Sequence, residues 1–271
     1  MTPQWQPCVP SSAPTWRVIP VPKVSHSPDF RRALKSITQG ELLIAPLRAY
    51  LYDPNFKGFD VKVRGIGKRD PDDWFHPSTH PSWSERALYL YVLHPEVLIT
   101  EPMNPMAVLS MTAGSIWHSI IGRILCDELS IVEQLEVPVK CMETKAMGHM
   151  DGIVGDSIFE FKTAKDMALA KIGSAEDYIR RYPGYYLQAM EYMRMSGYRS
   201  ERVLVMALTY PYEMREFVIE WDQAVANQTS EKYLRVRQAV ADQRMPDCSG
   251  CASAVECPAR AMCDHLFREA I

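Results

Sequence analysis

The sequence predicts an α/β fold with a mixed central sheet flanked by helices. Two short apolar runs, at 153–154 and 158–159, lie on either side of Gly155-Asp156, a pair that favours a tight turn between paired strands. Helix-length and strand-length segments follow one another around this hairpin, as in α/β proteins. An apolar fraction of 47% in 271 residues is enough for a substantial core.

Composition divides the chain into four parts. The first part carries seven prolines, which predicts an extended arm, and the last holds four of the seven cysteines. The predicted parts are a proline-rich arm (1–28), a mostly helical N-terminal region (29–105), an α/β core (106–244) and a cysteine-rich metal-binding segment (245–271).

In the N-terminal region, helix breaks are expected near Gly40 and Pro46. Ser82 is a candidate N-cap, and Asn104-Pro105 is typical of a helix start. The elements expected before the sheet are a helix at 30–51, a strand at 59–63, a loop at 64–82 and helices at 85–93 and 105–126. Those expected afterwards are a strand at 132–141, the hairpin at 147–162, a helix at 182–195, strands at 202–208 and 215–221, and a helix at 223–243.

The hairpin carries the candidate active site. Asp151 precedes the turn and Glu160 follows it, so the two carboxylates can converge at one end of the hairpin. Because side chains alternate along a strand, Glu160 and Lys162 share one face while Phe161 points to the other. Two carboxylates beside an ammonium fit a divalent-metal site with a neighbouring lysine. The alternative is a solvated strand face, on which these residue types are common.

Two helices offer further candidates. His118 has Gly114 one turn earlier on its face, which leaves room for close approach, and a neutral imidazole can bind Mn²⁺. A core histidine bonded to a backbone carbonyl fits the same pattern. Gln188 and Tyr192 are four residues apart and share a helix face, where they could support the site or form an aromatic edge.

Other histidines and cysteines complete the candidates. His76 and His80 are separated by Pro77, so a shared helical face for metal binding is not expected. In the tail, four cysteines lie in a loop-like segment and suit a Zn²⁺ site or an iron–sulfur cluster. These are Cys248, Cys251, Cys257 and Cys263. Cys126 and Cys141 lie in apolar segments and are expected in the core.

Charge and cysteine content restrict the class of protein. A net charge of −3 excludes a global basic field, although residues 162–202 contain eight Lys or Arg against five Asp or Glu. No apolar run reaches the length of a membrane span, and the N-terminus lacks secretory features. An odd number of cysteines argues against an extracellular disulfide framework. We therefore expect a cytoplasmic protein without a membrane partner, and the family resemblance given next implies a bacterial or phage-infected cell.

The order Gly-x₃-His, Asp, Glu-x-Lys and Gln-x₃-Tyr resembles the PD-(D/E)XK nucleases, specifically the RecB-like exonuclease branch, across residues 111–208. The resemblance implies a restriction-endonuclease-like core with Lys162 as the catalytic lysine. It implies Mg²⁺ or Mn²⁺ ligands at His118, Asp151, Glu160 and the Phe161 carbonyl, with Gln188 and Tyr192 supporting the site. Glu136 resembles an acidic position on the preceding strand, but could equally be a surface partner for Lys140.

The tail spacing Cys-x₂-Cys-x₅-Cys resembles the trio that holds a [4Fe–4S] cluster in RecB-like nucleases, including CRISPR-adaptation and AddB-type enzymes. In those relatives a fourth cysteine lies upstream of the histidine helix, whereas here the only upstream candidate is Cys8. The fourth ligand is therefore open between Cys263 and Cys8, and Zn²⁺ is the alternative metal.

The expected function is a metal-dependent DNA exonuclease acting on single strands or duplex ends in recombination, repair or phage DNA metabolism. A recombination partner or a homo-oligomer is compatible with this expectation. The alternatives are a non-catalytic DNA-binding or assembly subunit and a spacer-trimming nuclease of CRISPR adaptation. A binding subunit does not need Asp151, Glu160 and Lys162 together, which favours the enzyme.

Overall fold

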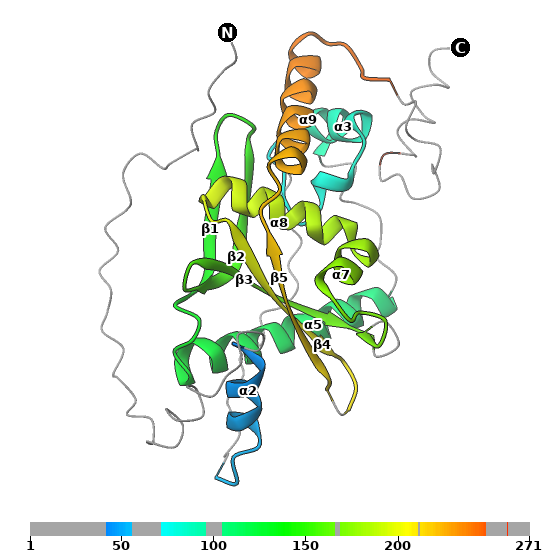
Figure 1. Cartoon of the computed structure of the whole chain (residues 1–271). Helices are drawn as coiled ribbons and strands as arrows, with labels where there is room; N and C mark the ends of the chain where they lie inside the picture. Colours follow the sequence, from blue (N-terminus) through cyan, green and yellow to red (C-terminus); the bar gives the residue numbers. More distant parts are fainter. Residues whose placement is uncertain are drawn as a thin grey trace.

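The structure is a computed structural model that describes residues 42–55, 72–95, 105–165, 169–210, 212–247 and 259. The described strands form one five-stranded sheet in the order β1-β2-β3-β4-β5 (Figure 1). They are β1 Gln134–Cys141, β2 Ala146–Val154, β3 Ser157–Ala164, β4 Ser200–Ala207 and β5 Met214–Glu220. Within this sheet only the β3–β4 pair is parallel, so the predicted mixed sheet is confirmed.

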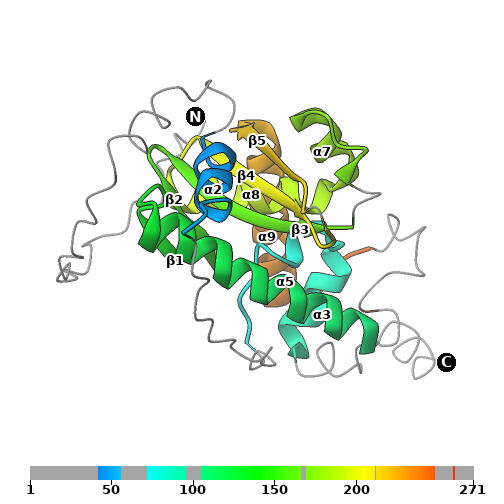
Figure 2. The same ribbon diagram turned by 90° about the horizontal axis from the view of Figure 1, so that it is seen from below.

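Helices cover both faces of the sheet (Figure 2). On one face α5, Pro105–Arg123, runs along the strands, continues into a π-helical turn at Ile124–Glu128 and shares an apolar cluster with α2, Ile44–Leu51. The other face carries α3 Glu85–Leu93, α7 Ala175–Arg181, α8 Pro183–Ser196 and α9 Gln223–Ala241. The sheet therefore has a separate apolar cluster on each side.

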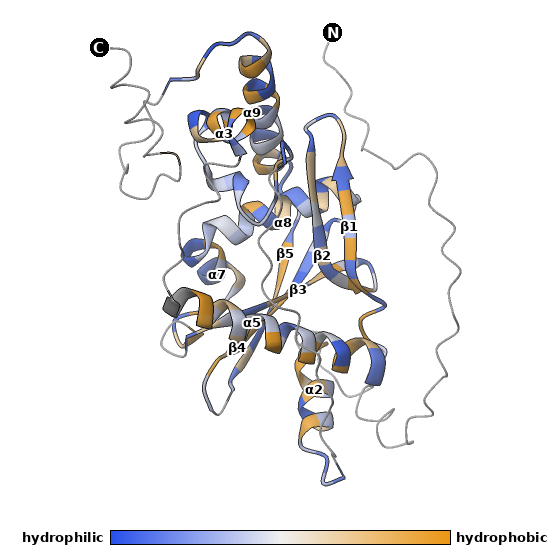
Figure 3. Ribbon diagram, turned by 180° about the vertical axis from the view of Figure 1, so that it is seen from behind, coloured by the Kyte–Doolittle hydropathy of each residue, from blue (hydrophilic) through white to orange (hydrophobic). Residues whose placement is uncertain are grey.

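Hydropathy explains these layers. Along β3, Ile158 faces the cluster of α8 and α9, whereas Phe159 and Phe161 face the cluster of α5. Such alternation between two buried faces is expected for a central strand with helices on both sides. Figure 3 shows both apolar and hydrophilic residues along α9, as expected of a helix that packs with one side only. Among the described helices, none is long and apolar enough to cross a membrane.

Most predicted core elements are found within a few residues of their expected bounds, two local predictions are wrong, and one helix was missed. Pro46 does not interrupt α2, because it lies in the first turn, where the missing N–H has no helical partner to lose. Ser84, not Ser82, caps α3 by accepting from the Ala87 N–H at 3.2 Å. The short helix α7 was not expected. The predicted strand at 59–63 and the tail cysteines lie outside the described residues.

Candidate active site

The candidate site lies where β2 and β3 part. The two strands pair only beside their turn, from Gly152↔Phe159 to Val154↔Ser157, and Gly155 makes the turn with φ +57°. Beyond that point β3 continues along β4 to Ala164, while β2 is bridged instead by Phe75 from the N-terminal region. The divergence opens the space between the strands in which Asp151 and Glu160 lie.

Asp151 is held by one contact from β3 and one from α5. Its Oδ2 accepts from the Phe161 backbone N–H at 2.8 Å, and its Oδ1 lies 3.0 Å from Nε2 of His118 on α5. Nδ1 of His118 faces Glu136 at 3.8 Å. Glu136 has φ +52°, an unfavourable conformation for a non-glycine residue, and it occupies the unpaired position of β1 opposite Asp151.

The approach of α5 depends on a glycine, as the sequence suggested. A Cβ on Gly114 would lie 3.2 Å from Oγ1 of Thr163 on β3. A larger side chain there would require Thr163 to shift by a few tenths of an ångström, at the contact that lies one turn from His118.

Glu160 is held by contacts on the face of the sheet that carries α8. Its side chain is only 3% exposed, and it forms an ion pair with Lys162, two residues later on the same face. Gln188 on α8 donates to the same oxygen, Oε1, at 3.3 Å. The ammonium of Lys162 also lies 4.7 Å from the ring centroid of Tyr185, a cation–π contact. The predicted common face of Glu160 and Lys162 is thus confirmed.

The four charged groups shift one another's pKa values. Burial alone would raise the pKa of Asp151, but His118, Lys162 and the Phe161 N–H together hold it below its usual range. Burial, reinforced by Asp151, raises the pKa of Glu160 to about 7 despite Lys162. Although burial disfavours their cationic forms, the carboxylates raise the pKa values of both His118 and Lys162. At neutral pH Asp151 is therefore ionised and Lys162 is protonated.

The carboxylates of the site fit a cation, although their present contacts are with other side chains. Among the described residues, no three His, Cys, Asp or Glu side chains form a group that could hold a metal ion. Asp151 contacts His118, and Glu160 contacts Lys162. The other oxygen of Glu160, Oε2, is nevertheless buried without any hydrogen-bond partner. A buried, unsatisfied carboxylate oxygen is costly unless a cation or donor meets it. This oxygen of Glu160, with the ionised Asp151 nearby, is therefore the part of the site that suits a hard divalent cation.

Tyr192 closes one side of the site. It hydrogen-bonds with Gln188, one turn earlier on α8, and burial raises its pKa. A Cβ on Gly148 of β2 would lie 3.0 Å from Cε1 of Tyr192 and 3.2 Å from Cδ of Pro77. The helix face predicted from the Gln-x₃-Tyr spacing thus meets both β2 and the N-terminal region.

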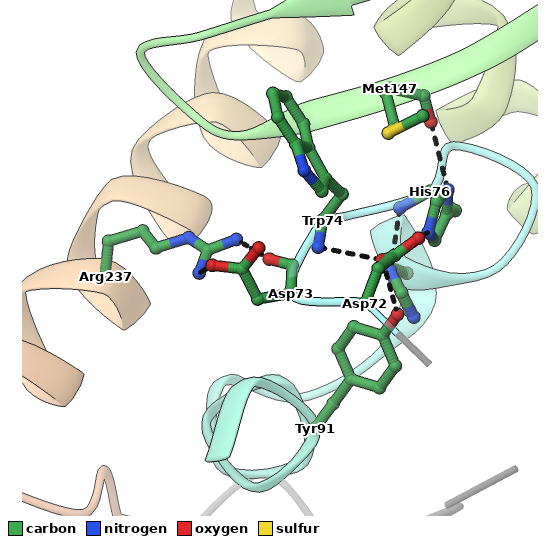
Figure 4. Close-up of polar contacts among 8 residues, drawn as sticks. Asp72, Asp73, Trp74, His76, Tyr91, Met147 and Arg237 are labelled. Atoms are coloured by element: carbon green, nitrogen blue, oxygen red, sulfur yellow. Dashed lines mark hydrogen bonds and ion pairs between the residues drawn. The ribbon is translucent and has the colours of Figure 1, made fainter. Parts of the chain in front are cut away.

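The segment that bridges β2 is anchored by a buried polar network (Figure 4). Oδ1 of Asp72 lies 2.9 Å from Nε2 of His76 and accepts from the Trp74 N–H and the Tyr91 hydroxyl. Nδ1 of His76 lies 3.2 Å from the Met147 carbonyl. Each ring nitrogen of His76 faces an acceptor, so contacts within this network occupy both nitrogens. The expectation about metal binding by His76 and His80 stays a prediction.

Two residues near the site were not predicted. Tyr185 lies one turn before Gln188, and its ring covers Lys162. Glu201 on β4 is 2% exposed, pairs with Ile158 in the parallel ladder and has an unpartnered Oε2. Burial, followed by Glu160, raises its pKa well above the usual value. Only the β3–β4 register brings Glu201 here, and no local spacing signals it.

Some predicted site residues are not tested by these contacts. Cys141 is buried and Cys126 half-buried, as expected. Cys8, Cys248, Cys251, Cys257 and Cys263 lie outside the described residues. The carbonyl of Phe161 has no contact in the site that would test it as a ligand.

Comparison with known proteins finds similar solved structures, among them the two that follow. The sequence matches no protein-family model and no curated protein. The crystal structure of SSO0001 is 15% identical, with a TM-score of 0.43 over 71% of this chain and 89% of that chain. LHK-Exo in complex with dAMP is 12% identical, with a TM-score of 0.42 over 63% of this chain and 89% of that chain. We assign no family from these similarities.

Proposed function

We propose that this protein is a divalent-metal-dependent nuclease that hydrolyses phosphodiester bonds in DNA. The observation that carries the proposal is the pair Asp151 and Glu160 at the divergence of β2 and β3, with Lys162 against them and one buried oxygen of Glu160 unsatisfied. The proposed substrates are single strands or duplex ends, in keeping with the RecB-like motif order.

Asp151 and Glu160 are the residues that would hold Mg²⁺ or Mn²⁺, with His118 and the Phe161 carbonyl as further proposed ligands. Bound there, the cation would supply an acidified water and neutralise charge on the phosphoryl oxygens. Neighbours keep Asp151 ionised at neutral pH. Glu160, with a pKa of about 7, releases its proton readily when positive charge approaches.

Lys162 is proposed to act as a donor rather than as a base. Its pKa is raised by Glu160 and Asp151, so its ammonium keeps its proton at neutral pH. A protonated amine can orient the attacking water and stabilise negative charge that develops on the phosphate. Gln188 holds the Glu160 carboxylate at 3.3 Å and so fixes the partner of this ammonium.

The cysteine-rich tail is proposed to bind a [4Fe–4S] cluster or Zn²⁺ through Cys248, Cys251, Cys257 and either Cys263 or Cys8. A metal bound there would contribute folding energy to the C-terminal segment. The tail begins beside the N-terminal region, because Arg86 Nε on α3 donates to the Pro246 carbonyl at 2.9 Å.

The proposal predicts that labelled linear DNA is degraded with Mg²⁺ or Mn²⁺ and not with EDTA. We expect Lys162→Ala to lower the rate by about 10²–10³-fold, the range for removal of one donor that stabilises developing negative charge. Lys165→Ala is the matched control, because this exposed lysine follows the end of β3. An unchanged rate in Lys162→Ala would exclude the proposed role. Binding of DNA without any cleavage by the wild type would favour a binding subunit.

A further inference from the structure

Three aromatic rings from α5 and the β4–β5 loop lie together on the surface, and we call them the aromatic patch: Trp117, Tyr210 and Tyr212. The ring centroids of Trp117 and Tyr212 are 5.1 Å apart, and those of Tyr212 and Tyr210 are 6.4 Å apart. Tyr210 is 85% exposed and Tyr212 39%. Single exposed aromatic residues are common, but three rings in a row, with Tyr212 touching both others and Tyr210 largely open to solvent, are not.

The backbone is strained where it presents these rings. Tyr212 has φ +56°, a conformation that side chains other than Asn, Asp and Gly rarely adopt. Such strain persists where surrounding contacts maintain it, and it is enriched at functional sites. In this loop the strained residue is the one whose ring joins Trp117 to Tyr210.

Helix α5 links the patch to His118 of the candidate active site, whereas Glu160 and Lys162 lie on the other face of the sheet. Trp117 immediately precedes His118, and Gly114, one turn earlier on α5, packs against Thr163 next to Lys162. Helix α5 contains no acidic residue in its 19 positions, and its last turn carries Arg123. The exposed Glu213 follows Tyr212 in the loop and lies 3.5 Å from Arg215, so a cation accompanies the negative charge beside the patch. A helix without negative charge and a paired loop carboxylate repel a polyanion little.

We propose that the aromatic patch is a base-stacking surface for a single-stranded nucleic acid whose backbone leads past His118 to Asp151 in the candidate active site. The inference deepens the proposed nuclease function and rests on it for the direction of the strand. Rings of this kind stack on any base, so the surface tolerates sequence variation, as a processive or end-acting nuclease requires. The proposal also places the nucleic-acid strand on the α5 side of the site.

Strand binding can be measured without cleavage. The Lys162→Ala protein in EDTA is titrated into a labelled oligothymidylate of about 20 nucleotides, longer than typical stacking sites, and anisotropy is followed. In this background Tyr210→Leu is expected to weaken binding by about 5- to 150-fold, the range for loss of one stacked base. Tyr210→Phe keeps the ring and should retain affinity. Tyr52→Leu is the matched control, because Tyr52 is 75% exposed at the end of α2.

An abasic strand of equal length keeps the phosphate charges but has no bases, so its affinity reports charge attraction without stacking. We expect this strand to bind weakly both to Tyr210→Leu and to its parent, with no difference between the two proteins. Equal affinity of Tyr210→Leu and its parent for the thymidylate strand would overturn the inference. A change in sedimentation without a change in DNA affinity would also overturn it, in favour of a protein contact. If the wild type cleaves no DNA but ring-dependent binding persists, only the proposed nuclease function fails.

Discussion

At the scale of single residues, Asp72 shows how one carboxylate fixes a segment beside the site. It accepts hydrogen bonds from His76, the Trp74 N–H and Tyr91, and through His76 it is linked to the Met147 carbonyl of β2. Burial opposes its charge, but these contacts together lower the pKa of Asp72 below its ordinary value. Its ionised form is therefore favoured by folding.

We predict that Asp72→Asn lowers the free energy of unfolding by about 1.5–3 kcal/mol at pH 7, the usual effect of losing hydrogen bonds to a charged group. A depressed pKa gives stability that is present above the unfolded value near 4 and is lost as pH falls through the folded value. Urea unfolding from pH 3 to pH 7 should thus show the two proteins converging in acid. A difference that stayed constant down to pH 3 would contradict this account.

Individual residues of the candidate site could be named from the sequence, whereas their charge states could not. The spacing Glu-x-Lys places Glu160 and Lys162 on one face because strand geometry is local. The neighbours that set their pKa values come from elsewhere. Glu201, for example, is 41 positions from Glu160 and reaches it through the parallel register of β3 and β4.

At the scale of elements, close contact between β1 and β2 depends on Gly152. A Cβ at this position would lie 2.5 Å from the backbone carbonyl of Gln134 and 2.8 Å from Cγ1 of Val132. A backbone oxygen cannot rotate away, so the strands themselves would have to separate. Asp151, the adjacent residue, would move with them.

We predict that Gly152→Ala lowers the free energy of unfolding by about 3 kcal/mol or more, the upper range for overpacking. Gly184→Ala is the matched control, because nothing lies within 4 Å of a Cβ there and alanine favours the helix. Thermal melts of both variants would test this. Equal melting temperatures for the two would show that the β1–β2 contact is not restrictive.

Elements were predictable where periodicity and turn residues agree, as in the hairpin with Gly155 at its bend. Predictions failed where two local signals compete. Both Ser82 and Ser84 can cap a helix, and only the packing of η1, His80–Ser82, against α8 assigns the cap to Ser84. The helix α7 spans seven residues, too few for a clear period of 3.6.

At the scale of the whole molecule, the site joins the two layers on opposite faces of the sheet. His118 reaches Asp151 from α5, whereas Gln188 reaches Glu160 from α8. The N-terminal region adds a third side through Phe75 and Pro77. The sequence predicted the sheet and the two helices, but not that residues 72–80 occupy the edge of β2, because no short-range pattern encodes this pairing.

Binding of Mn²⁺ tests the central claim, a cation held by Asp151 and Glu160, most directly. EDTA-treated wild type, Asp151→Asn and Asp156→Asn are titrated with Mn²⁺ and the free ion is measured by electron paramagnetic resonance. Asp156 is exposed in the β2–β3 turn and makes the matched control. We predict that the wild type and Asp156→Asn each bind an ion that Asp151→Asn has lost. Identical binding curves for all three proteins would contradict the account.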